Sequence, residues 1–189
     1  MFTLESDLKY VESAIPVLED FILSNDLYWP LSGAPSGTGS DQLSLGMLEV
    51  MEMRLLALPD THPLRKKAVP LYGQIDAILN RWQSNYRQKA IREWHARMRQ
   101  WQSYLGELRH NSQRLNTYAY EVRLRLILHE FSEWVEVADR EVLADLDQSL
   151  LASLDEGHFV WEPEIAGGFP ASRYPFLYVR IEKSEETTR

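Results

Sequence analysis

Apolar residues recur along most of this chain at alternating spacings of three and four, which is the period of one face of an α-helix. In the first such stretch the recurring residues are Leu4, Leu8, Val11, Ile15, Leu18 and Ile22. The pattern predicts a helix over residues 4–24, kinked or briefly broken at Pro16, because a proline ring disturbs a helix interior. A second helix is predicted over residues 41–58, with Ser40 or Asp41 as its N-cap.

A segment rich in glycine and proline separates these two helices, over residues 25–41. Such long loops are uncommon in compact domains and often carry a function. Within it, Tyr28 and Trp29 bring large apolar side chains that can add much contact area. We expect this pair to cover one end of the helical bundle. Contact with a ligand that the loop gates is the alternative.

Two longer heptad patterns follow, and they predict an antiparallel helical hairpin over residues 70–156. The outgoing arm, over residues 70–109, carries Ile91, Trp94, Met98, Trp101, Leu105 and Leu108. The first half of this arm has its apolar face offset by one residue, which predicts local unwinding of a continuous helix. Pro70 suits the first helical position. The returning arm, over residues 113–156, carries Tyr120, Leu124, Ile127, Phe131, Trp134, Leu143, Leu146, Leu150 and Leu154.

The end of the chain changes character, because two short runs over residues 159–161 and 176–181 are rich in aromatic and β-branched side chains. They predict a small β-hairpin over residues 158–182, followed by a solvated tail over residues 183–189. The predicted fold class is therefore all-α. It is an elongated helical bundle, residues 1–157, built on a long antiparallel helical hairpin, with two shorter helices in residues 1–60 and a small C-terminal β-hairpin.

Composition limits the classes of function. The chain has 189 residues, of which 44% are hydrophobic, and it has no cysteine. A disulfide framework and a thiolate metal site are therefore excluded. No apolar stretch is long enough to cross a membrane, and the first residues lack the pattern of a secretory signal. We expect a cytoplasmic protein that makes no membrane contact.

Charge is unevenly distributed along the chain, although the net charge is −8. Residues 1–60 have a net charge of −8, residues 61–125 of +9, and residues 126–189 of −9. One interpretation is that acidic and basic segments neutralise each other in the fold. The other is that a basic surface is kept for an anionic partner. Candidate contacts to an anion or a partner project from the seam or flank the predicted turn; they are Arg92, Arg99, Arg109 and Arg114.

Two short motifs resemble metal sites but lack the required partners. Glu107 and His110 have the Glu-x-x-His spacing of di-iron bundles, which need two such motifs. His129 begins a zinc-protease-like pattern in which Glu133 stands where the second histidine belongs. An exposed ladder of charges with Arg125 accounts for that helix face. No catalytic, cofactor-binding or metal-binding residue is predicted, and no cofactor.

The leading hypothesis is a non-catalytic helical interaction or scaffold protein that self-associates, with a dimer favoured. The two shorter helices are too short to cover the whole hairpin seam, and uncovered apolar surface on a soluble protein usually marks an interface. A different protein could also cover this apolar surface as a partner. One alternative is a nucleic-acid-binding protein that uses the basic tip of the hairpin. A weaker alternative is a helical-bundle enzyme that acts on a small molecule or depends on a metal.

Overall fold

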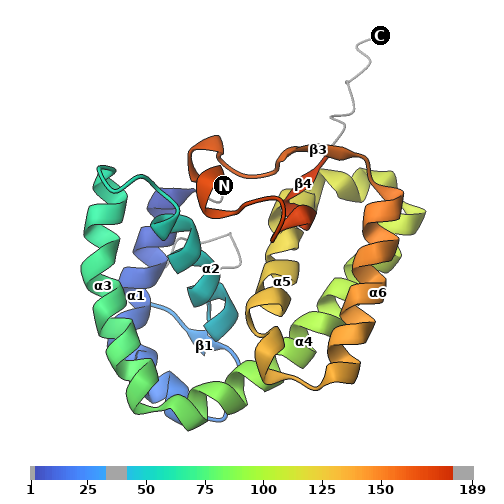
Figure 1. Ribbon diagram of the computed structural model, residues 1–189. Helices are drawn as coiled ribbons and strands as arrows, with labels where there is room; N and C mark the ends of the chain where they lie inside the picture. Colours follow the sequence, from blue (N-terminus) through green and yellow to red (C-terminus); the bar gives the residue numbers. More distant parts are fainter. Residues whose placement is uncertain (1–2, 33–41, 181–189) are drawn as a thin grey trace.

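The structure is a computed structural model that describes residues 3–32 and 42–180 (Figure 1). Its α-helices are α1 (Leu4–Leu23), α2 (Leu45–Leu56), α3 (Pro63–Arg81), α4 (Gln83–His110), α5 (Tyr118–Glu130) and α6 (Val137–Ser153). Four short 3-10 helices connect them or follow them: η1 (Ser112–Thr117), η2 (Ser132–Trp134), η3 (Pro163–Gly168) and η4 (Pro175–Leu177). The proposed caps Ser40 and Asp41 and the predicted tail 183–189 lie outside the described residues.

Two small antiparallel strand pairs complete the fold. β1 (Trp29–Pro30) pairs with β2 (Gln42–Leu43), and β3 (Glu156–Phe159) pairs with β4 (Tyr178–Val179). The predicted all-α class with a small C-terminal β-hairpin is confirmed. Among the described residues, no helix has both the length and the apolar character needed to cross a membrane.

The first two helices begin at side-chain caps. Thr3 and Ser6 form a capping box at the start of α1, which satisfies backbone N–H groups that have no partner within the helix. α1 continues through Pro16 as one helix, without a break. α2 begins after Ser44, whose hydroxyl accepts a hydrogen bond from the Met47 N–H at 3.3 Å.

The predicted arm over residues 70–109 is wrong as one helix, because it is divided at Trp82. The backbone of Trp82 has φ −113° and ψ 34°, which ends α3, and α4 starts at the next residue. The Trp82 indole N–H donates to Glu19 of α1 at 2.8 Å, so the break is tied to the neighbouring helix. The one-residue offset in the apolar pattern is thus accommodated by ending the helix.

This break places α3 beside α1 and sends α4 across to the other half of the molecule (Figure 1). α3 also starts earlier than predicted, with Pro63 in its first turn and Pro70 in its interior. The first half of the predicted hairpin arm therefore packs against α1 and α2, and only α4 serves as the outgoing arm.

The hairpin seam itself is confirmed over α4 and α5, which η1 joins. Trp94, Trp101, Ile127 and Phe131 are all buried, each with 1% or less of its surface exposed. α2 and the C-terminal segment cover α5 on its other sides. Other elements of the same chain therefore cover the seam at these four positions. The prediction of self-association assumes an uncovered seam, which these positions do not provide.

Ion pairs connect the basic middle of the chain to the acidic segments on both sides. On the N-terminal side, Nη1 of Arg81 in α3 lies 3.3 Å from Glu19 of α1. Arg125 of α5 forms a two-pronged pair with Asp147 of α6, at 2.7 and 2.5 Å. These contacts favour the interpretation that the charged segments neutralise each other.

The predicted exposed ladder around His129 is wrong. Arg125 is buried, and its guanidinium lies 4.4 Å from the ring centroid of Phe176. His129 packs against the Tyr174 and Phe176 rings, and burial, followed by the charge of Arg125, lowers its pKa to about 4. The C-terminal segment covers this helix face, which helical periodicity alone could not show.

Candidate functional site

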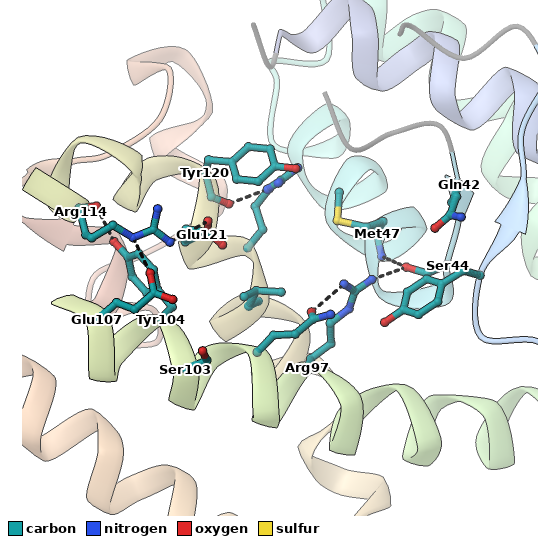
Figure 2. Close-up of a pocket in the computed structure, with 14 residues that line it drawn as sticks. Gln42, Ser44, Met47, Arg97, Ser103, Tyr104, Glu107, Arg114, Tyr120 and Glu121 are labelled. Carbon is teal, nitrogen blue, oxygen red and sulfur yellow. Dashed lines mark hydrogen bonds and ion pairs between the residues drawn. The ribbon is translucent and has the colours of Figure 1, made fainter. Parts of the chain in front are cut away.

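A polar pocket of about 500 Å³ opens between the start of α2, the middle of α4 and the start of α5 (Figure 2). Three arginines line it, each from a different element: Arg97 of α4, Arg114 of η1 and Arg123 of α5. Tyrosine, glutamine and serine side chains and two glutamates complete the polar lining. We call this site the arginine pocket.

Helical periodicity explains the contribution of α4. Arg97, Gln100, Tyr104 and Glu107 are three, four and three residues apart, so they lie along one side of the helix. This polar row runs beside the buried seam of Trp94, Trp101 and their neighbours. One side of α4 therefore packs in the core, and the adjoining side presents hydrogen-bonding groups to the pocket.

A buried carboxylate holds the start of α2 against α4. Glu93 has no exposed surface, and its Oε2 accepts a hydrogen bond from the Gly46 N–H at 3.1 Å. Gly46 lies in the first turn of α2, where backbone N–H groups lack helical acceptors and negative charge is favourable. The Glu93 carboxylate thus acts as a cap supplied by a different helix.

Gly46 also permits the close approach of α2 to α5. A Cβ atom at this position would lie 2.4 Å from Cγ2 of Ile127 and 3.0 Å from Oε1 of Glu93. Both neighbours are buried, so neither has room to move. The glycine therefore sets the distance between α2 and the two helices that form the other walls of the pocket.

Arg97 connects α4 with the start of α2 and with Tyr28. Its Nε and Nη2 donate to Oε1 of Glu93 at 3.0 and 2.9 Å, and its Nη2 also donates to the Ser44 hydroxyl at 2.8 Å. Its Nη1 donates to the Gln100 side chain at 3.0 Å. The guanidinium lies 5.2 Å from the ring centroid of Tyr28, within range of a cation–π interaction. This arginine is rigidly held, and Glu93 balances its charge.

Arg123 lies beneath the ring of Tyr120, with its guanidinium carbon 3.4 Å from the ring centroid. Its Nε donates to the Tyr120 carbonyl at 2.6 Å. Burial, and then repulsion from Arg54, lowers the pKa of Arg123 below its ordinary value. An anion bound nearby would favour the charged form of Arg123.

Arg114 lies at the other end of the pocket, between two carboxylates. Its Nε is 2.9 Å from Glu107 and its Nη2 is 4.0 Å from Glu121. The Tyr104 hydroxyl donates to the Arg114 backbone carbonyl at 3.0 Å, and this contact fixes the η1 backbone beside α4. About a third of the Arg114 side chain is exposed. Arg114 can therefore exchange a carboxylate partner for a ligand at low cost.

The pocket also contains a serine hydroxyl, that of Ser44. The Ser44 hydroxyl accepts hydrogen bonds from Arg97 and from the Met47 N–H, and no histidine is among the residues that line the pocket. A serine nucleophile requires an adjacent base. Within residues 3–32 and 42–180, no group of three or more His, Asp or Glu side chains is placed to hold a metal ion.

The residues singled out from the sequence do not form one site. Arg114 lines the pocket, whereas Arg92 donates to the Asn25 carbonyl and Arg99 is exposed on α4. Arg109 lies beside a different cavity. The four arginines therefore do not all line one cavity.

The two loop residues predicted as contacts have separate places. Tyr28 lines the arginine pocket beside Arg97. Trp29 is partly buried and packs against the Phe21 ring, with centroids 6.4 Å apart. Trp29 therefore packs on the helical core, whereas Tyr28 borders the pocket.

Sequence reasoning missed Glu93, Arg97 and Arg123 as site residues. Glu93 and Arg97 are four residues apart on one helix, which is the usual spacing of an exposed ion pair. The available signal was their position next to the seam residues Trp94 and Met98. Charged side chains directly beside a heptad seam are candidates for burial when a further helix packs on that side.

Comparisons of this chain with protein-family models, with curated proteins and with solved structures gave no match.

Proposed function

We propose that this protein is a non-catalytic binding protein for a small polar molecule that carries an anionic group, either a carboxylate or a phosphate. The observation that supports this proposal is the convergence of Arg97, Arg114 and Arg123 on one cavity of about 500 Å³. Guanidinium groups bind both kinds of anion through paired N–H donors. The volume lies within the usual range of ~300–1,000 Å³ for small-molecule sites.

The charges around the cavity indicate where each part of the ligand would bind. Glu93 neutralises Arg97, whereas Arg114 lies between Glu107 and Glu121 with about a third of its side chain exposed. The anionic group would therefore bind between Arg114 and Arg123 and replace a carboxylate partner of Arg114. Glu107 and Glu121 would then accept hydrogen bonds from hydroxyl or ammonium groups at the other end of the ligand.

The test is calorimetric titration of the protein with inorganic phosphate and, separately, with succinate as a carboxylate. We expect saturable binding of at least one of the two. Arg114→Gln should weaken that binding by about 10- to 100-fold, because a hydrogen bond to a charged group contributes ~1.5–3 kcal/mol. Arg114 is partly exposed, so this substitution should leave the fold intact.

Arg99→Gln is the matched control, because it removes an exposed arginine from α4 outside the pocket. It should leave the affinity unchanged. The proposal fails if neither anion binds saturably, or if the two substitutions weaken binding equally. Equal weakening would indicate diffuse attraction to surface charge instead of a defined site.

A further inference from the structure

A second cavity, of about 320 Å³, lies between the end of α4, η1 and the end of α6. Five leucines line it: Leu105, Leu108, Leu115, Leu150 and Leu154. We call this cavity the leucine socket. It is near the lower limit of ~300 Å³ for ligand pockets, and Arg109 and Ser149 are the polar residues among those that line it. An apolar side chain from another protein surface is a better match to it than a polar small molecule.

Arg109 stands at the rim of the leucine socket. Its side chain is exposed, and it makes no ion pair with any described residue. Arg114, only five residues along the chain, has two carboxylates nearby. A helix or loop that fills the socket with an apolar side chain would therefore bind more tightly if it also carried a carboxylate that pairs with Arg109.

The outer face of α6 has this combination of groups. Val137, Ala144 and Leu151 recur every seven residues along it and are exposed, Leu151 with 41% of its surface. Residues seven apart lie along one line of a helix surface, so these three form one exposed apolar row. Glu141 and Asp145 flank the row, are exposed, and make no ion pair within residues 3–32 and 42–180.

The socket and the outer face are adjacent on α6, because Leu150 lines the socket and Leu151 follows it on the exposed side. A surface that contains both a knob and a matching socket is self-complementary, which is the requirement for a twofold contact. We infer that two copies of this chain associate here, with Leu151 of each copy in the leucine socket of the other. Arg109 of each copy then faces the carboxylates of its partner's α6.

Sedimentation equilibrium tests this inference on the full chain. The parent protein should show a reversible dimer at micromolar and higher concentrations. Leu151→Lys and Arg109→Glu should each weaken association by at least about tenfold, since a central contact contributes ~1.4 kcal/mol or more. Both positions are exposed, so folding should be retained, which a far-ultraviolet spectrum checks. Val69→Lys is the matched control, because Val69 is an apolar residue of α3 with 50% of its surface exposed; it should leave the dimer intact.

The absence of cysteine allows an independent measurement. Copies carrying Leu151→Cys, mixed with copies carrying Leu108→Cys, should form a mixed disulfide under mild oxidation. Copies with Val69→Cys and Leu108→Cys should form far less. A parent protein that stays monomeric at every concentration would overturn the inference. A dimer that persists in both Leu151→Lys and Arg109→Glu, and that forms no disulfide when Leu151→Cys and Leu108→Cys copies are mixed, would also overturn it. The two copies would then associate through another surface.

Discussion

The replacement of Glu93 by glutamine tests whether the arginine pocket depends on a buried ion pair. Glu93 and Glu107 lie on the same helix and each is paired with an arginine at 2.9 Å. They differ in burial, since the Glu93 side chain has 0% exposure and that of Glu107 has 54%. The pair of substitutions Glu93→Gln and Glu107→Gln therefore compares the same chemical change in two environments.

The expected cost follows from the contacts that each carboxylate makes. Glu93→Gln leaves the Arg97 guanidinium without its counter-charge in a buried position and weakens the acceptor of the Gly46 N–H. Breaking one side of a buried pair costs about 3–5 kcal/mol. Glu107→Gln breaks an exposed pair, which contributes only ~0–1 kcal/mol.

Urea unfolding followed by tryptophan fluorescence measures both free energies. We expect a large fall in the midpoint for Glu93→Gln and a small one for Glu107→Gln. In the double variant Glu93→Gln with Arg97→Met, the loss should be smaller than in Glu93→Gln alone, because the uncompensated cation is gone. Equal, small effects of the two glutamine substitutions would refute the buried-pair account of how α2 is held to α4.

Three further changes test the core and its charges by the same unfolding assay. Trp101→Ala should destabilise by about 3–5 kcal/mol, because it removes a fully buried aromatic side chain; an unchanged midpoint would contradict the seam. Trp94→Phe should lower the free energy of unfolding more than Trp101→Phe does. The Trp94 indole N–H donates to the Leu128 carbonyl at 3.0 Å, whereas the Trp101 indole N–H has no hydrogen-bond partner among the described residues. The reverse order would be inconsistent with these contacts. Burial raises the pKa of Glu49 to about 7 and that of Glu52 to about 9, from an ordinary value of 4.5. The folded protein therefore holds more protons than the unfolded chain, and these groups make stability fall as pH rises from about 4.5 to about 9. Glu52→Gln should reduce that fall, and an unchanged pH slope would show that Glu52 is ionised in the folded state.

The helical class and the buried seam could be predicted from the sequence, because both depend on a local period. Trp94, Trp101, Ile127 and Phe131 recur at helical spacing and are buried as expected. The division at Trp82 could not be predicted in the same way. An offset of one residue is compatible with one locally unwound helix or with two separate helices. The structure has two helices, and the Trp82 indole between them contacts Glu19, 63 residues away in the sequence.

The candidate site was harder to predict than the fold, because its residues are brought together by packing. Arg97 and Arg123 are separated by 26 positions, and helical periodicity shows neither that α2 covers the first nor that Tyr120 covers the second. The charge pattern drew attention to the basic middle of the chain, which contains all three arginines of the pocket. It favoured the exposed arginines Arg92 and Arg99, whereas the arginines with the most specific surroundings are buried.

The most direct test of the proposed binding site is a titration that observes its arginines individually. In ¹⁵N–¹H spectra of the side chains, the Nε–H resonances of Arg97, Arg114 and Arg123 should shift saturably as inorganic phosphate or succinate is added, with one common Kd. The resonance of Arg99, which is exposed on α4 outside the pocket, should stay unchanged. If the three resonances do not move, or if they shift linearly together with that of Arg99, the arginine pocket is not an anion-binding site.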